Sequence, residues 1–280
     1  GGKRDLDACM RGGAGAVNAC GMAAMRHTRT LASIKALGGG GGGSRGSGFP
    51  GVPRGRSCAV VGNAGHMRKK LYGTHIDNHD VVIRFNLVPL ERKHVGTRTH
   101  VRLINFGASK SVCNKGVKAL AAGESSVGEL RAVMMWHKDS RGAVAACIRG
   151  PKVLGRSAGS RVRQVSAGEI GPVTQRRLRD AMRKVKKDLT ALGVPSMKAQ
   201  FAPELTSGAQ AVLLALGHCK HVSVYGMSSF NPVSYQASAG YHYQGRGRLR
   251  VTGNKVHDWA MEAGAWRLLF AAGKLALCAS

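Results

Sequence analysis

The chain has 280 residues, of which 43% are hydrophobic, so it is long enough to bury one substantial core. Its formal charge of +29 indicates attraction to polyanions, whether nucleic acid, anionic membranes, acidic glycans or phosphorylated substrates. The sequence contains no run of about 18 apolar residues, which excludes a predicted membrane span, and its polar first residues do not resemble a signal peptide.

The first part of the chain is rich in glycine. An unbroken glycine run covers 38–43, and only a short helix is predicted within 1–37. We therefore predict a flexible stem or tail over 1–55 and one globular domain over 56–280. Seven cysteines are present without a C-x-x-C pair, which argues against a zinc ribbon and leaves both the pairing and the redox compartment open.

Short apolar runs alternate with helical patterns after residue 55. Strands are predicted at 58–61, 81–83, 101–104, 133–136 and 222–225, and helices at 175–192, 208–218 and 257–270. This alternation is typical of an α/β domain with a largely parallel sheet.

Two polar turns follow predicted strands. Gly62-Asn63-Ala64-Gly65 follows the first strand, and its glycines suit either a tight structural turn or a backbone cradle for phosphate. Asn86 follows the second strand, where its amide could bind a ribose or phosphate or simply form a turn.

Later segments add a helix start and two histidines. Thr206-Ser207-Gly208 precedes an apolar helix, where ordinary capping and anion binding are both compatible with the residues. His242 lies between Tyr241 and Tyr243, and His257 precedes Glu262 by five positions. A single histidine on a helix is more often structural than catalytic, and the pair raises the odds of chemistry only moderately.

Taken in this order, the segments resemble the four sialylmotifs of the eukaryotic sialyltransferases, glycosyltransferase family 29. The large motif resembles residues 58–99, with C-A-V-V-G-N-A-G, I-D-N-H-D, R-F-N and V-G-T-R-T. The small motif resembles Thr206-Ser207-Gly208 through V-S-V-Y-G, the third resembles Tyr241-His242-Tyr243, and the very small motif is H-x-x-x-x-E at His257 and Glu262. The resemblance covers roughly 56–270 and is weakest over 107–200.

The resemblance implies a fold and a reaction. The fold is a Rossmann-like, GT-A-type variant with a mostly parallel central sheet flanked by helices. The reaction is inverting transfer of sialic acid, or a related acid sugar such as Kdo, from a CMP-sugar donor to a glycan hydroxyl. Expected partners are this donor and a glycan acceptor on a glycoprotein or glycolipid, in the Golgi lumen, with a membrane anchor upstream of this chain.

The resemblance also implies roles for single residues. The donor-binding set is Asn63, Asn86, Ser207 and Gly208, supported by Gly62, Gly65, Tyr241 and Glu262. His242 would stabilise the departing phosphate, and His257 would be the general base. A disulfide between Cys58 and Cys219 would join the large motif to the small one.

No metal or other cofactor is expected. The only Asp-x-Asp spacing is Asp5-Leu6-Asp7, which lies before the glycine run and is interpreted as a solvated or capping pair. Two alternatives stay open: a polyanion- or RNA-binding protein that uses the basic segment 175–187, and an inactive sialyltransferase-like protein. The lack of RNP, KH or zinc patterns and the few aromatics speak against nucleic acid as the partner.

Overall fold

The computed structural model describes residues 2–11, 18–22, 49–54, 56–87, 89–115, 120, 129–140, 142–150, 165–193, 204–227 and 257–278. Seven parallel strands form one sheet in the order β5-β4-β3-β2-β1-β6-β7. Their bounds are β1 Ser57–Val61, β2 Val81–Phe85, β3 Val101–Ile104, β4 Ala132–Met135, β5 Ser166–Glu169, β6 His221–Tyr225 and β7 Ala276–Cys278. The predicted Rossmann-like α/β architecture is confirmed, and the sequence patterns missed only β5 and β7 among these strands.

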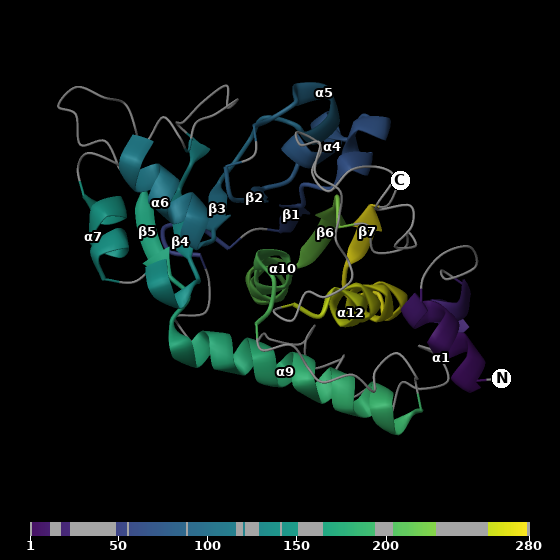
Figure 1. Ribbon diagram of the computed structural model, residues 1–280. Coiled ribbons are helices and arrows are strands. Elements are labelled where there is room, and N and C mark those ends of the chain that lie inside the picture. The colour runs from purple at the N-terminus through teal and green to yellow at the C-terminus, as the bar shows by residue number, and fades with distance from the viewer. Residues whose placement is uncertain are drawn as a thin grey trace.

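Helices cover both faces of the sheet, as Figure 1 shows. Before β5 come α1 (Gly2–Arg11), η1 (Gly65–Lys69), α4 (Gly73–Asp77), α5 (Arg92–Val95), α6 (Phe106–Lys115), η4 (Lys138–Ser140) and α7 (Ala143–Arg149). After β5 come α9 (Pro172–Ala191), α10 (Ser207–His218) and α12 (Trp259–Ala271). The three helices predicted from 175, 208 and 257 are therefore confirmed within a few residues.

Alternate residues of each strand pack into different hydrophobic clusters, because successive side chains point to opposite faces of the sheet. Cys58 and Val60 of β1 join a large cluster with residues of α1, α9, α10 and α12. Ala59 and Val61 pack on the other face with residues of η1, α4 and α5. Burial on both faces explains why the central strands read as continuous apolar runs rather than as alternating ones.

The N-terminal segment departs from the prediction. Within 1–55, the structure places α1 against α12, and Leu6 and Cys9 are fully buried there. The guanidinium of Arg267 on α12 donates to the carbonyls of Cys9 and Met10 at 2.8 and 2.6 Å. The prediction of a flexible stem is therefore wrong for this helix, and the glycine run lies outside the described residues.

Three disulfides are present, and one is the pair that the family resemblance implies. Cys58 of β1 is bonded to Cys219, which caps the end of α10. The other two join Cys9 to Cys20 and Cys113 to Cys147, while Cys278 is free and half-buried. Among the described residues, no helix is both long enough and apolar enough to span a bilayer.

Candidate active site

The sheet changes winding direction between β1 and β6. From β1 the chain runs outward to β5, then returns to add β6 and β7 on the other side. In open parallel sheets the ligand crevice lies at such a switch point, beyond the carboxyl ends of the strands. Here the ends of these two strands are followed by Gly62 and Gly226.

The two glycines bring the strand ends into contact. The amide of Gly62 donates to the carbonyl of Tyr225 at 2.7 Å, and that of Ala64 donates to the carbonyl of Gly226 at 3.2 Å. A Cβ on Gly62 would lie 2.3 Å from the carbonyl oxygen of Gly226, so no larger residue fits. Asn63 follows at once and is half-buried, while Gly65 begins η1 and is buried.

Asn86 lies at the carboxyl end of the neighbouring strand β2. It adopts a left-handed backbone with φ of 48°, which asparagine tolerates better than most residues. Its Oδ1 accepts from the amide of Asn105 at 3.0 Å, and its carbonyl accepts from the buried guanidinium of Arg102 at 2.8 Å. These contacts fix the turn, and the side-chain Nδ2 makes no hydrogen bond to any of the residues that the structure describes.

The start of α10 is tied to α12 by a buried carboxylate. Thr206 is the N-cap of α10, and its Oγ1 accepts from the amide of Ala209 at 3.0 Å. The carboxylate of Glu262 accepts from the amide of Thr206 at 2.9 Å and from its hydroxyl at 2.6 Å. Burial raises the pKa of Glu262 to about 7, opposed by these hydrogen bonds and reinforced by the charge of Asp258. The small and very small motifs therefore meet through one carboxylate.

The next two residues of α10 contact other parts of the same sheet edge. The hydroxyl of Ser207 accepts from Nε1 of Trp136, at the end of β4, at 2.9 Å. Gly208 lies so close to Met227 that a Cβ would approach its methyl group at 2.7 Å. Since Met227 follows Gly226, this packing connects the helix start to the glycine crossing at Gly62.

His257 is held by the chain that leads into α10. Its Nδ1 lies 3.0 Å from the carbonyl oxygen of Glu204. Because a carbonyl only accepts, Nδ1 carries the proton, and the lone pair of Nε2 is left for a substrate. The next residue, Asp258, caps α12 through the amide of Met261 at 3.1 Å and pairs with the buried ammonium of Lys186 at 2.7 Å. The backbone before α12 is thus fixed on both sides of the imidazole.

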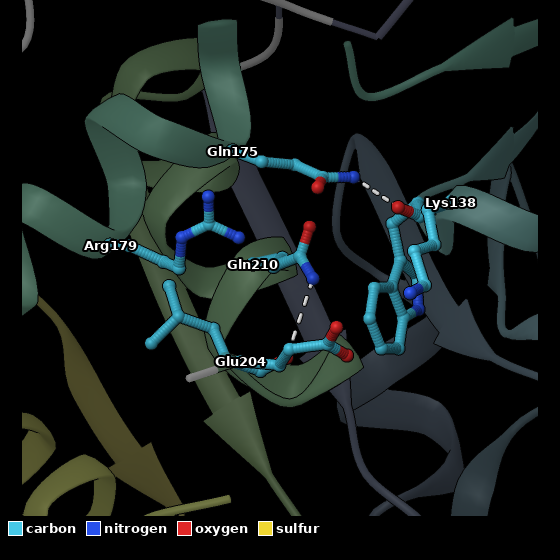
Figure 2. Close-up of a pocket in the computed structure, with 7 residues that line it drawn as sticks. Lys138, Gln175, Arg179, Glu204 and Gln210 are labelled. Atoms are coloured by element: carbon cyan, nitrogen blue, oxygen red, sulfur yellow. Dashed lines mark hydrogen bonds between the residues drawn. The ribbon is translucent and has the colours of Figure 1, made fainter. Parts of the chain in front are cut away.

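A pocket opens between the end of β4 and the starts of α9 and α10, with an open volume of about 440 Å³. Figure 2 shows the side chains of Gln175, Arg179 and Gln210 pointing toward Lys138 across it, with Glu204 at its lower side. Trp136 and Leu205 also line the pocket. Gln175 is held by the carbonyls of Trp136 and Ile170, to which its Nε2 donates. Sequence reasoning missed this pocket, because its residues come from three separate segments and only the one around Gln210 overlaps a recognised motif.

The predicted site is thus assembled in part. Glu262 and His257 are joined to the chain at the start of α10 through Thr206 and Glu204, next to Ser207 and Gly208. Asn63 and Asn86 lie at the ends of adjacent strands on the same edge. Tyr241 and His242 lie outside the described residues, so their place stays a prediction. Within the described part of the chain, no three His, Cys, Asp or Glu side chains are grouped as metal ligands would be.

The parallel sheet, its switch point and the helix starts gathered there define a doubly wound α/β protein with a ligand crevice at the carboxyl edge. The model of glycosyltransferase family 29 (sialyltransferase) matches residues 50–274, so the chain belongs to this family. The structure is similar to a mammalian sialyltransferase in complex with Gal-beta-1-3GalNAc-ortho-nitrophenol, with a TM-score of 0.50 and 18% identity, covering 89% of this chain and 78% of the other.

Two curated relatives indicate the range of the family. A β-1,6-galactosyltransferase of Arabidopsis thaliana is 27% identical over 75% of this chain and 50% of its own length. The β-galactoside α-2,6-sialyltransferase 2 of Rattus norvegicus is 41% identical, but over only 28% of this chain and 17% of its own length. The chain therefore spans half or less of these relatives.

Proposed function

We propose that the protein is an inverting glycosyltransferase that transfers sialic acid, or a related acid sugar, from a CMP-sugar to a glycan hydroxyl. The observation that carries this proposal is a histidine fixed beside the start of α10, close to the crevice at the switch point of the sheet. His257 presents Nε2 beside the start of α10, and that start is packed through Met227 onto the glycine crossing at the switch point.

In this proposal the nucleotide binds at the carboxyl ends of β1 and β2. Asn63 and Asn86 hold the CMP, and the backbone at Ser207 and Gly208 offers N–H groups at the positive end of a twelve-residue helix to its phosphate. These groups, together with His242, would stabilise the charge on the departing phosphate. Neutralisation by such preorganised donors needs no metal ion.

The proton is taken by His257. Its Nε2 accepts the proton of the acceptor hydroxyl as that oxygen forms a bond to the anomeric carbon. The bond from this carbon to the CMP oxygen breaks at the same time, and CMP leaves with the electron pair. Because attack comes from the face opposite CMP, the anomeric configuration is inverted. An imidazole whose Nε2 is unprotonated suits this role.

The disulfides support an oxidising compartment, and we place the reaction in the Golgi lumen, on a glycan of a glycoprotein or glycolipid. The donor is the open part of the proposal, since one relative bears the name of a galactosyltransferase. Nucleotide and sugar must therefore be tested separately.

The purified protein is incubated with CMP-sialic acid, CMP-Kdo or UDP-galactose and a panel of glycan acceptors, and release of nucleotide is measured with and without EDTA. The proposal expects release from a CMP-linked acid sugar, unaffected by EDTA. Transfer from UDP-galactose alone would overturn the donor assignment, and loss of transfer in EDTA would overturn the metal-free mechanism.

A further inference from the structure

The pocket beside the base contains a buried amide without a full set of partners. The side chain of Gln210 is on a residue only 3% exposed, and its Oε1 makes no hydrogen bond in the described structure. Its Nε2 donates to the carbonyl of Leu205 at 3.4 Å, which fixes the oxygen toward the pocket seen in Figure 2. An unsatisfied buried acceptor destabilises the fold, so this oxygen fits a position that receives a ligand hydroxyl.

The same pocket holds charged groups that do not pair with one another. No described residue forms an ion pair or hydrogen bond with the side chains of Lys138, Arg179 or Glu204, although all three line the cavity. Figure 2 shows the guanidinium of Arg179 directed into the pocket from α9. A guanidinium in this position matches a carboxylate, which it can bind through two parallel hydrogen bonds. The indole of Trp136 supplies an apolar wall, as sugar and drug-sized ligand sites commonly have.

Positive charge continues from the pocket along α9. Five basic side chains of this helix are exposed, and only two acidic residues, Asp180 and Asp188, oppose them. The exposed basic residues are Arg176, Arg177, Arg183, Lys184 and Lys187. A helix of 20 residues extends about 30 Å, which is long enough to follow several sugar units.

The pocket lies to one side of the glycine turn at which the nucleotide is proposed to bind, and it adjoins the proposed phosphate site at the hydrogen bond from Trp136 to Ser207. Trp136 follows β4, which is separated from β1 by β3 and β2, and three strand spacings of ~4.8 Å place it about 14 Å from the Gly62 turn. Glu204 lines the pocket while its carbonyl orients His257. The group that loses a proton to this imidazole belongs to the acceptor, so the adjoining pocket lies on the acceptor side of the reaction.

We propose that the pocket at Trp136, Arg179 and Gln210 is an acceptor subsite for a carboxylate-bearing sugar, and that the acceptor is an acidic glycan whose chain follows α9. The identification of this sugar as the acceptor rests on the proposed function. The binding of an acidic sugar in the pocket does not depend on which donor is used. Arg179 and Lys138 receive the carboxylate, and the amide oxygen of Gln210 receives a ring hydroxyl.

The test compares two oligosaccharides that differ in whether C6 is a carboxylate, trigalacturonate and galactotriose. Binding to the purified protein is measured by calorimetry, with and without saturating CMP, and the affinity for CMP is measured in the same samples. We expect trigalacturonate to bind at least about tenfold more tightly than galactotriose, a difference of about 1.4 kcal/mol. Saturating CMP should leave this binding in place.

Three variants sharpen the test. Arg179→Gln should weaken trigalacturonate binding about tenfold and leave galactotriose unchanged, whereas Lys93→Gln, an exposed cation on α5, should change neither. Gln210→Leu should weaken both sugars with little net change in thermal stability, because it removes an unsatisfied buried oxygen together with the long 3.4 Å hydrogen bond from Nε2 to the carbonyl of Leu205.

Equal affinity for the two sugars, equal effects of Arg179→Gln and Lys93→Gln, or displacement of trigalacturonate by CMP would each overturn the subsite. Equal effects of the two cation variants would indicate general attraction to a chain of charge +29. Failure of CMP to bind, with trigalacturonate still bound at Arg179, would instead count against the proposed function and keep the subsite.

Discussion

Two regions, one near the amino ends of β2 and β3 and one at the carboxyl edge of the sheet, use similar polar residues for different purposes. Between α4 and β3, Asp77 accepts from the amides of Thr97 and Arg98 at 2.9 and 3.0 Å, and the buried guanidinium of Arg84 donates to the carbonyls of Val95 and Arg98. Both charged side chains are used in hydrogen bonds that fix the backbone. At the junction of α10, α12 and the pocket, by contrast, Nε2 of His257 and the side chains of Arg179 and Glu204 make no hydrogen bond or ion pair with any described residue.

This contrast indicates that the large motif mainly stabilises the fold, whereas the later motifs present groups that can bind a ligand. Within the large motif, the charged side chains of Asp77 and Arg84 are hydrogen-bonded to backbone amides and carbonyls before β3. The later helix starts carry groups whose hydrogen-bonding capacity is incomplete, as expected where a ligand binds. Four predictions test this division, from the largest expected effect to the smallest.

The largest effect is expected at His257. Replacing it by alanine removes the proposed base and should lower the transfer rate by about 10²–10⁴-fold, the usual range for a general base. The affinity for CMP should stay within twofold of the parent, roughly the error of the measurement, because the imidazole is held on the acceptor side of the site. Full activity in this variant would contradict the assigned role.

Asp77 should govern stability rather than chemistry. Asp77→Ala leaves two backbone amides and the nearby guanidinium of Arg84, 3.9 Å away, without their carboxylate. We expect a loss of about 4 kcal/mol in the free energy of unfolding, measured by denaturant titration. Asp139→Ala, at an exposed carboxylate, is the matched control and should cost less than about 0.5 kcal/mol.

Glu262 should make stability depend on pH. Its pKa is raised by burial from 4.5 to about 7, so the protonated form is favoured in the folded state. Stability contributed by this carboxyl is fully present below about pH 4.5 and is lost as the pH rises to about 7, by roughly 3 kcal/mol in total. Compared with the parent, Glu262→Gln should lack this loss in unfolding curves taken across that range. Parallel pH profiles for the two proteins would contradict it.

The smallest effect is expected at Trp136. Trp136→Phe keeps an aromatic wall but removes the hydrogen bond from Nε1 to the hydroxyl of Ser207 at 2.9 Å. The loss should be about 1 kcal/mol, seen as a several-fold rise in KM with little change in kcat. A larger fall in kcat would indicate that the start of α10 moves when this bond is lost.

Particular residues show how far sequence patterns reach. The apolar run at 58–61 and the glycine after it predict a strand and a turn correctly, because burial on both faces leaves a strong local signature. The short strands β5 and β7 carry no such signature. The β5 sequence Ser-Ala-Gly-Glu has little β-propensity, and it is extended because it pairs with β4. Within 1–55, α1 was missed as a packed element because its partner α12 is more than 240 residues away in the chain.

Local sequence patterns were enough to predict the α/β class and the positions of the central strands and long helices, and the ordered motifs gave the family resemblance, which implies the disulfide between Cys58 and Cys219. These follow from local periodicity and from motifs that a single chain displays in order. Only the tertiary structure decided that Glu262 holds Thr206, that Glu204 orients His257, and that Gln210 and Arg179 share a pocket. Those contacts join residues 31 to 56 positions apart, and they depend on how helices pack across a sheet, which no local pattern encodes.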